Sequence, residues 1–267
     1  MTRIVLGIEY DGSRFAGWQW QIKHRNIQHE LQIALSKIAK HPITVHCAGR
    51  TDSGVHATEQ IVHFDTTAAR DLQAWHRGTN THLPDDVRVI WAQAAVGDFH
   101  ARYRAIARFY RYVILNRNTP SALKRGQTTW YPVPLDAEKM HHAAQSLIGQ
   151  HDFSSFRAQG CQSQSPCRKM YFIDVHREGD LVIIELSANA FLHHMVRNIA
   201  GVLMSIGAGK QPVSWSRELL ELKDRQLGGV TAPPYGLHLA GVYYPDHYGI
   251  AKHPIFNKLP ADARRYD

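Results

Sequence analysis

Residues 43–64 read ITVHCAGRTDSGVHATEQIVHF, and the order of residue types in this stretch decides the fold prediction. Residues 43–48 and 60–64 are rich in apolar and β-branched side chains, which is typical of strands. Between them, residues 49–54 contain two glycines, a serine and an aspartate, which favour a loop. The stretch therefore predicts two strands joined by a loop that presents the carboxylate of Asp52.

The residues before this stretch predict one more strand and a helix. Residues 3–10, RIVLGIEY, are mostly apolar and are followed by the turn residues Asp-Gly-Ser. From Ile27 to Ile38 apolar residues recur at helical spacing, with Asn26 as the N-cap, and Pro42 ends the helix. The order strand, helix, strand, loop, strand indicates a domain of mixed helices and strands.

The second part of the chain predicts a similar series. A basic and aromatic segment at 99–115 ends in a strand, and a helix with apolar residues from Met140 to Ile148 follows, with Gly149 as its C-terminal cap. The next strands are expected at 170–177 and 181–188, and the last helix and strand at 215–222 and 239–244. Both halves thus run strand, helix, strand, strand, which favours two similar halves with a cleft between them. We place the domains at 1–104, 105–245 and a polar C-terminal tail, 246–267.

One helix of the second half is expected to carry a functional side chain. Its apolar stripe consists of Leu192, Met195, Val196, Ile199, Leu203 and Ile206. At 100° per residue, Arg197 points away from this stripe, on the same side as the small residue Gly201. This side is expected to leave room for a ligand or for another backbone.

Composition limits the classes of protein. The chain has 267 residues, of which 44% are hydrophobic, enough for a core, and a formal charge of +8 favours a polyanionic partner such as nucleic acid. Three cysteines cannot all pair, which fits a cytoplasmic location. No apolar run approaches the roughly 20 residues that span a bilayer, so no membrane insertion is expected. The spacings C-x-x-C and H-E-x-x-H are absent, so no metal site is expected.

Residue types alone leave two interpretations of the Asp52 loop. The guanidinium of Arg50 favours the ionised carboxylate, which is the form that acts as a nucleophile. Asp, Ser and Gly are equally common in ordinary turns, and spacing by itself favours a turn.

Residues 49–57, GRTDSGVHA, resemble the catalytic signature G-R-T-D-x-G-V-H-A of the tRNA pseudouridine synthase A family of pseudouridine synthases. Ser53 stands at the variable position, where the family often has alanine. The resemblance extends along nearly the whole chain, through the segments GIEYDGSRFAGWQWQ, FHARYRA, ARFYRY, NRN, FLHHMVRNIAG and GLHL. By this resemblance the sequence is identified as a member of the family.

The resemblance implies roles for individual residues. Asp52 would attack the target nucleotide, at C6 of uracil or at C1′ of ribose, and Arg197 would pair with this carboxylate. Tyr110 would pack against the target base and take part in removing its C5 proton. Arg50 would displace the base from its stack, and Leu237 would line the pocket beneath it. Candidates for phosphate contacts or stacking, each with a surface or core role as the alternative, are Arg14, Trp18, Arg102, Arg104 and Arg108.

The resemblance also implies an α+β pseudouridine synthase fold, with a mainly antiparallel central sheet shared by two similar halves, flanking helices and a catalytic cleft. The implied reaction is the isomerisation of uridine to pseudouridine in the anticodon stem-loop of tRNA, at positions 38–40, by a cytoplasmic homodimer without a cofactor. An RNA-binding module or RNA chaperone without catalysis is the alternative, although a pure binder has no need of a buried carboxylate. A hydrolase with an Asp nucleophile or metal ligand is a third class, against which the absence of D-x-D, Walker and G-x-G-x-x-G motifs counts.

Overall fold

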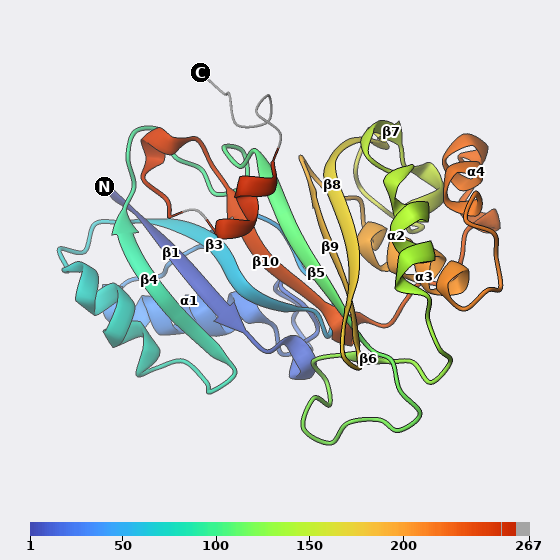
Figure 1. Ribbon diagram of the computed structural model, residues 1–267. Coiled ribbons are helices and arrows are strands. Elements are labelled where there is room, and N and C mark those ends of the chain that lie inside the picture. The colour runs from blue at the N-terminus through green and yellow to red at the C-terminus, as the bar shows by residue number, and fades with distance from the viewer. Residues whose placement is uncertain (252, 260–267) are drawn as a thin grey trace. The chain divides into compact units, whose positions relative to one another are not determined.

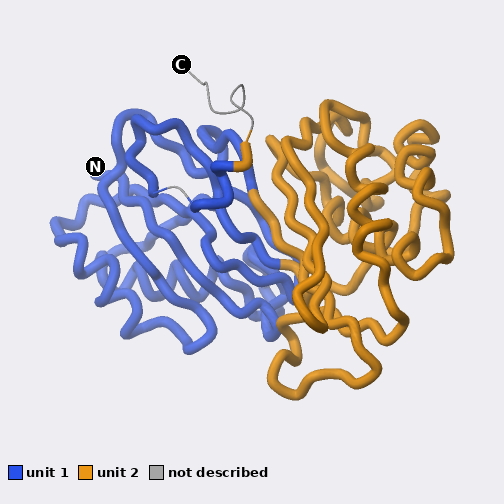
Figure 2. The backbone as a smooth tube through the Cα atoms, viewed as in Figure 1, with its two compact units in different colours: residues 1–108, 238–257, 264–267 blue, residues 109–237, 258–263 orange. Residues whose placement is uncertain are grey.

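The computed structural model describes residues 1–251 and 253–259. These residues form two compact units (Figures 1 and 2). Among the described residues, unit 1 contains 1–108 and 238–257, and unit 2 contains 109–237 and 258–259. The sequence predicted three contiguous domains, 1–104, 105–245 and 246–267. This division stays a prediction. Residues 238–245 lie in unit 1, because the last strand returns to the sheet with which the chain begins.

Unit 1 is built on a sheet with the strand order β4-β1-β3-β10. Strand β1 (Thr2–Tyr10) pairs antiparallel with β3 (His56–Thr66) and with β4 (Val87–Ala94). Strand β10 (Leu237–Tyr243) pairs with β3 in parallel, and the short β2 (His46–Cys47) pairs with β3 antiparallel. The pairing places the loop between β2 and β3, which carries Asp52, at one end of this sheet.

Helix α1 (Ile27–Ala39) and the side chain of Trp91 each cover part of the unit 1 sheet. Helix α1 lies across one face (Figure 1), and Asn26 caps it, because the Asn26 Oδ1 accepts a hydrogen bond from the His29 N–H at 3.0 Å. This confirms the helix and the N-cap expected from the sequence. On another part of the sheet the indole of Trp91 lies over Gly7, where an added Cβ would come within 2.3 Å of Trp91 Nε1. The same indole nitrogen donates to the Glu59 carboxylate at 2.9 Å.

Residues 246–251 and 253–257 belong to unit 1 and pack within it, although the sequence suggested a polar tail. The 3-10 helix η6 (Asp246–Tyr248) is held because the Gln93 side chain donates to the Tyr248 carbonyl at 3.2 Å and the Tyr248 hydroxyl donates to Asp98 at 2.7 Å. Farther on, the ring of Phe256 lies 5.3 Å from that of Tyr243. The remainder of the expected tail, 252 and 260–267, lies outside the described residues.

The strands of unit 2 follow the order β5-β9-β8-β7. Strand β8 (Cys167–Glu178) pairs antiparallel with β9 (Leu181–Ala188) and with β7 (Gly149–Asp152). Strand β5 (Ala107–Leu115) lies next to β9 and pairs in parallel with the short β6 (Thr129–Trp130). Taken over all the strand pairs of the two units, antiparallel pairs outnumber parallel ones, as expected.

Three helices of unit 2 pack together, and one of them packs on the sheet. They are α2 (Ala137–Gln145), α3 (Met195–Gly207) and α4 (Trp215–Leu222), and Figure 1 shows them grouped beside β8. Helix α2 contacts β8 and both other helices. Gly149 opens β7 with φ +107° and does not cap the helix as expected, because α2 ends earlier, at Gln145. Among the described residues, none of the helices combines the length and the apolar character that a membrane span requires. The fold is α+β, which confirms the predicted class.

Candidate active site

The Asp52 loop begins with a buried anchor. The Thr51 side chain is 6% exposed, and its hydroxyl shares a hydrogen bond of 2.8 Å with the hydroxyl of Tyr10 at the end of β1. Asp52 itself is half-buried. Its carbonyl accepts from the Val55 N–H at 3.1 Å, and Gly54 has φ +78°, so the chain turns immediately after the carboxylate. The loop is therefore a tight turn with a fixed entry point.

A second segment, Phe15–Trp18, holds this turn from outside. The Trp18 N–H donates to the Thr51 carbonyl at 3.0 Å, and the Phe15 carbonyl accepts from the Ser53 hydroxyl at 3.2 Å. Gly17 lies between these contacts with φ +92°, and a Cβ on it would come within 2.7 Å of the Thr51 carbonyl oxygen. The contact requires glycine, because only glycine combines this φ with so close an approach. The sequence pattern around Gly17 does not predict this contact.

Cys47, close to the loop in sequence, is a different kind of group from Asp52. Burial, the largest effect, raises the pKa of the Cys47 thiol to about 12, although Arg50 and Arg102 favour the thiolate. The thiol is therefore protonated near neutral pH, and a thiol is a poor nucleophile. Asp52 is the stronger candidate for nucleophilic attack at this position in unit 1.

Four arginines predicted near RNA have distinct surroundings. Arg50 and Arg102 are exposed, and Arg102 extends over the ring of Tyr103, with 5.6 Å between Cζ and the ring centroid. Arg104 forms an ion pair with Asp98, and Arg14 with Asp86 at 3.1 Å. All four arginines are exposed on the surface of unit 1, and two of them, Arg14 and Arg104, are paired with carboxylates.

Arg108 and Trp18 have structural positions. The Arg108 guanidinium donates to the carbonyl of Ala48 at 3.0 Å and to that of Arg102 at 2.8 Å, so it joins the turn that carries Arg102 to the residues before the Asp52 loop. Trp18 is 2% exposed and packs near Tyr10, with ring centroids 6.2 Å apart. Its ring is enclosed by the protein, which agrees with the core role that the sequence allowed, and a contact of Trp18 with RNA stays a prediction.

In unit 2, strand β5 carries Tyr110. The Tyr110 side chain is 8% exposed, and its ring meets the ring of Phe191 edge to face at 5.0 Å. Tyr112, two residues on, is fully buried, and its hydroxyl contacts Thr129 at 2.7 Å. Burial raises the pKa of Tyr112, so this hydroxyl stays protonated. Phe109 is also fully buried, so Phe109 and Tyr112 are core residues.

Helix α3 carries Arg197. The sequence predicted one apolar stripe, whereas the helix is buried on nearly all sides, and Asn198 on it is only 1% exposed. Arg197 is one of the few half-buried positions, and its Nε donates to the Ala232 carbonyl at 2.8 Å. Gly201 lies where a Cβ would come within 1.8 Å of the Val230 carbonyl oxygen, so the expected neighbouring backbone is present.

Leu237 ends the segment that covers α3. It is 5% exposed and follows the 3-10 helix η5 (Pro234–Gly236) as the first residue of β10. Its burial agrees with the floor of a pocket, the role that the resemblance implies, and equally with a plain core position. The structure thus places Arg50 and Asp52 in unit 1, and Tyr110, Arg197 and Leu237 in unit 2.

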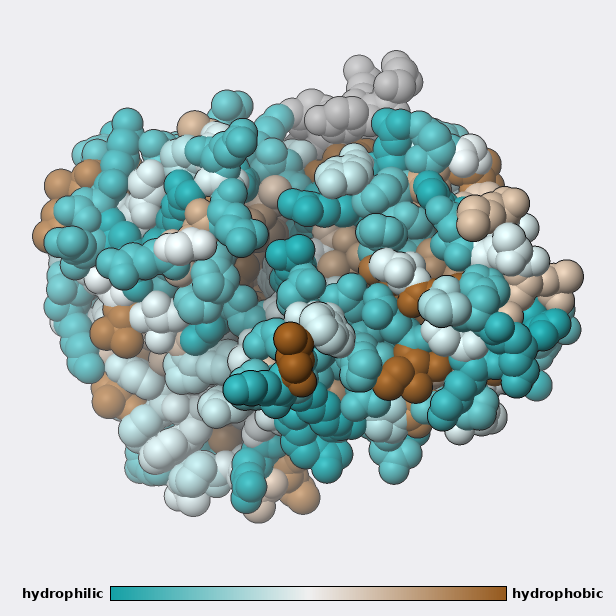
Figure 3. Space-filling model, turned by 180° about the vertical axis from the view of Figure 1, so that it is seen from behind, coloured by the Kyte–Doolittle hydropathy of each residue, from teal (hydrophilic) through white to brown (hydrophobic). Residues whose placement is uncertain are grey.

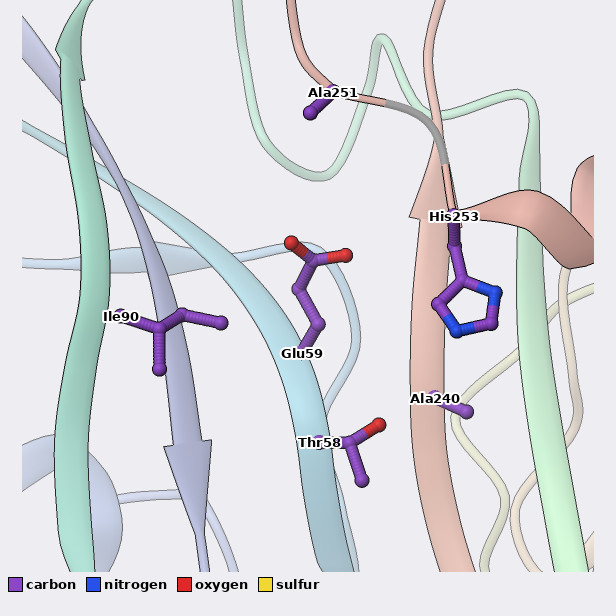
Figure 4. Close-up of a pocket in the computed structure, with 6 residues that line it drawn as sticks. All are labelled: Thr58, Glu59, Ile90, Ala240, Ala251 and His253. Atoms are coloured by element: carbon purple, nitrogen blue, oxygen red, sulfur yellow. The ribbon is translucent and has the colours of Figure 1, made fainter.

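A hollow of about 290 Å³ lies elsewhere on unit 1 (Figure 4). It is lined by Thr58, Glu59, Ile90, Ala240, Ala251 and His253. None of the predicted site residues lines it, so it is separate from the Asp52 loop. Figure 3 shows hydrophobic side chains in small separate groups among hydrophilic ones on the face opposite to that of Figure 1. Such a face suits a polar partner better than an apolar one.

Comparisons with known proteins identify the class. A family model described as tRNA pseudouridine synthase matches residues 7–104 and 143–245. A relative from Methylococcus capsulatus named tRNA pseudouridine synthase A is 60% identical over 264 residues, 99% of this chain and 97% of that protein. Relatives of the same name from Alcanivorax borkumensis and Shigella boydii are 51% and 55% identical to this chain. The matches cover 96% and 97% of this chain, respectively, and 96% of each relative.

A solved structure of an H/ACA ribonucleoprotein bound to a substrate RNA containing 2′-deoxyuridine aligns with a TM-score of 0.36 and 13% identity, over 76% of this chain and 44% of that one. That likeness is too distant to carry an argument. The family match and the close relatives define an isomerase that modifies tRNA. The chain belongs to the tRNA pseudouridine synthase family. Its resemblance to the tRNA pseudouridine synthase A group within that family is confirmed.

Proposed function

We propose that the protein isomerises uridine to pseudouridine in the anticodon stem-loop of tRNA, at positions 38–40, with Asp52 as the nucleophile. The observation that carries this proposal is the construction of the Asp52 loop. Thr51 is fixed from β1, and Phe15–Trp18 hold the turn from outside, while the carboxylate between these contacts remains half-buried. An ordinary surface turn needs no such support, whereas a nucleophile must be held in one position.

The reaction is balanced without another reactant. The bond between N1 of uracil and C1′ of ribose breaks, the base turns, and a bond between C5 and C1′ forms. C5 loses a proton and N1 gains one, so substrate and product are isomers and no electron acceptor is required. Asp52 attacks either C6 of the base or C1′ of the sugar, and in both cases it leaves when the new bond is complete.

Residues of unit 2 supply the remaining roles in this proposal. Tyr110 packs against the target base and takes part in removal of the C5 proton. Arg197 pairs with the Asp52 carboxylate, and Leu237 lines the floor beneath the base. Support comes from the rigid setting of two of these side chains, since Tyr110 packs on Phe191 and the Arg197 Nε is bound to a carbonyl. Fixed side chains serve catalysis better than mobile ones, because they lose less conformational entropy when the substrate binds.

The exposed arginines of unit 1 supply RNA contacts in the proposal. Arg50 displaces the target base from its stack, an operation that chemistry at a glycosidic bond requires in stacked RNA. Arg14, Arg102 and Arg104 contact phosphates, because guanidiniums at the surface match phosphate oxygens in charge and geometry. The ring of Tyr103 beside Arg102 is 73% exposed, which adds a surface for an unpaired base.

We also propose that the enzyme is a cytoplasmic homodimer that binds tRNA across both subunits. Three cysteines are free in the structure, as a reducing compartment requires. Sedimentation at micromolar protein concentration tests the dimer, and a monomer with full activity contradicts it.

The test is position-mapped pseudouridine formation on unmodified tRNA transcripts with wild-type protein and Asp52→Asn, without added metal. We expect Asp52→Asn to bind tRNA with a Kd within about threefold of wild type, and to lose on the order of a thousandfold in rate, because the amide cannot attack. Asp85→Asn is the matched control, since the Asp85 side chain is 99% exposed. An Asp52→Asn protein that retains the wild-type rate refutes the nucleophile. Wild-type protein that binds tRNA and makes no pseudouridine points to the RNA-binding alternative.

A further inference from the structure

Residues 225–237, here called the strap, run along helix α3 and reach strand β5 within unit 2. At the helix, the Val230 carbonyl lies directly over Gly201. At the strand, the Pro233 carbonyl accepts from the Tyr112 hydroxyl at 2.8 Å, and a Cβ on Gly236 would come within 2.5 Å of the Val113 carbonyl oxygen. The strap therefore joins the helix of Arg197 to the strand of Tyr110 and ends at Leu237.

One residue of the strap holds Arg197 at two points. The Ala232 carbonyl accepts from the Arg197 Nε at 2.8 Å, and the Ala232 N–H donates to the Arg197 carbonyl at 3.1 Å. Because a guanidinium is planar, a hydrogen bond at Nε orients the plane that contains its other nitrogens. The direction of the Arg197 guanidinium thus depends on where Ala232 lies.

A polar cluster anchors the strap next to Ala232. The Thr231 hydroxyl donates to the Asn198 Oδ1 at 2.6 Å and accepts from the Arg225 Nη2 at 3.0 Å. The same Nη2 lies 3.1 Å from the Asn198 Oδ1, and the Arg225 Nη1 donates to the Gly229 carbonyl at 3.0 Å. The Asn198 amide donates to the Phe156 carbonyl at 2.7 Å, so this side chain is fixed at both ends.

We propose that Thr231, Arg225 and Asn198 are positioning residues that set the orientation of Arg197 through the Ala232 carbonyl. This inference rests on the proposed role of Arg197 in the reaction. The cluster binds the strap to the helix residue that directly follows Arg197, so a shift of the strap changes the position of the carbonyl relative to the guanidinium. None of the three residues needs to touch the RNA.

The sharpest test compares Thr231→Val with Thr231→Ser. Valine keeps the shape of threonine and loses the hydroxyl, so neither the bond to Asn198 nor the bond from Arg225 is made. Serine keeps the hydroxyl and is the matched control. In single-turnover pseudouridine formation at saturating tRNA, we expect the rate of Thr231→Val to fall about tenfold, with the Kd for tRNA within about twofold and the rate of Thr231→Ser close to wild type. Arg225→Lys, which loses the guanidinium fork, is expected to follow Thr231→Val.

A double-mutant cycle shows whether the effect passes through Arg197. Thr231→Val is combined with Arg197→Ala, and we expect no further loss of rate in this background, because the group being positioned is already absent. Equal losses in both backgrounds overturn the positioning role and indicate a general structural effect. A wild-type rate in Thr231→Val also overturns the positioning role if Arg197→Ala alone is strongly impaired. If Arg197→Ala keeps the wild-type rate, the proposed role of Arg197 fails first, and that result is distinct from a failure of the strap.

Discussion

Gly17 is the residue on which the position of the Asp52 turn depends most directly. It combines a positive φ with a contact to the Thr51 carbonyl that leaves no room for a side chain. Gly97 also has a positive φ, +59°, but a Cβ on it would meet no atom within 4 Å. The two glycines therefore share the conformational requirement, and only Gly17 has the steric one.

We predict different outcomes for Gly17→Ala and Gly97→Ala. Each substitution costs roughly 1–2 kcal/mol of folding free energy, because an alanine is forced into the left-handed region. Gly17→Ala in addition pushes the Thr51 carbonyl away and moves Asp52, so its rate of pseudouridine formation should fall at least about tenfold. Urea unfolding and single-turnover kinetics on both variants measure the two effects. Equal activity in the two variants contradicts the role of Gly17.

At the scale of single residues, the sequence motif predicted the candidate nucleophile but not its support. The residues GRTDSGVHA single out Asp52 by resemblance. Gly17 lies 35 positions earlier in the sequence, and nothing in its neighbourhood indicates a contact with Thr51. Arg225 and Thr231 were missed for the same reason, since they act on a helix far from them in sequence. Such contacts are formed by the fold, and periodicity does not report them.

Strand β3 carries a buried histidine that should make the free energy of unfolding depend on pH. His63 on β3 is 1% exposed, and its Nδ1 accepts from the Ala101 N–H at 3.2 Å. Burial first, and then the neighbouring His100, Arg3 and His46, lower the pKa of His63 from 6.5 to about 3. Between these two pH values the unfolded chain binds a proton that the folded protein does not bind. The contribution of His63 therefore lowers the free energy of unfolding as the pH falls through this window.

We predict that His63→Gln unfolds with a weaker dependence on pH than wild type between about pH 6 and pH 4. One proton corresponds to a slope of about 1.4 kcal/mol per pH unit, and the variant should lose up to that amount of slope. Urea unfolding at several pH values measures it. His82→Gln is the control, because His82 is exposed in the same unit. If His63→Gln keeps the wild-type slope, His63 is not the buried neutral group that the structure describes.

The elements were predicted best where local pattern alone determines them. Strand β9 and helix α4 have the expected bounds, 181–188 and 215–222. The strand expected at 43–48 is reduced to β2, because the Ile43 N–H donates to the Ser36 hydroxyl at 2.9 Å and the Val45 N–H to Gln32 at 3.2 Å. Side chains of α1 thus bind the backbone that strand pairing would use. Strand β4 was missed, although the alternation in VRVIWAQA indicates it.

For the whole molecule, the charge of +8 leads to a prediction about salt. The logarithm of the association constant for tRNA should fall linearly with the logarithm of the salt concentration, because each phosphate contact releases counterions. Arg102→Ala should reduce the slope by about one, whereas Arg70→Ala should leave it unchanged. Arg70 is the control because its guanidinium contacts the Ile38 carbonyl at 3.2 Å, at the end of α1. Binding that does not depend on salt contradicts the phosphate contacts.

The return of the chain to unit 1 has a consequence for synthesis on the ribosome. Residues 1–108 emerge first, but β10, which pairs with β3 in parallel, follows only after residues 109–237 have been made. Throughout that interval the part of β3 that β10 later pairs, His56 and Ala57, lacks this partner strand, and open strand edges recruit strands from other chains. Most of unit 2 is contiguous, so it acquires its sequence neighbours without this delay. The sheet of the first unit to be translated is therefore completed only near the end of synthesis, and we expect this unit to need a chaperone during translation.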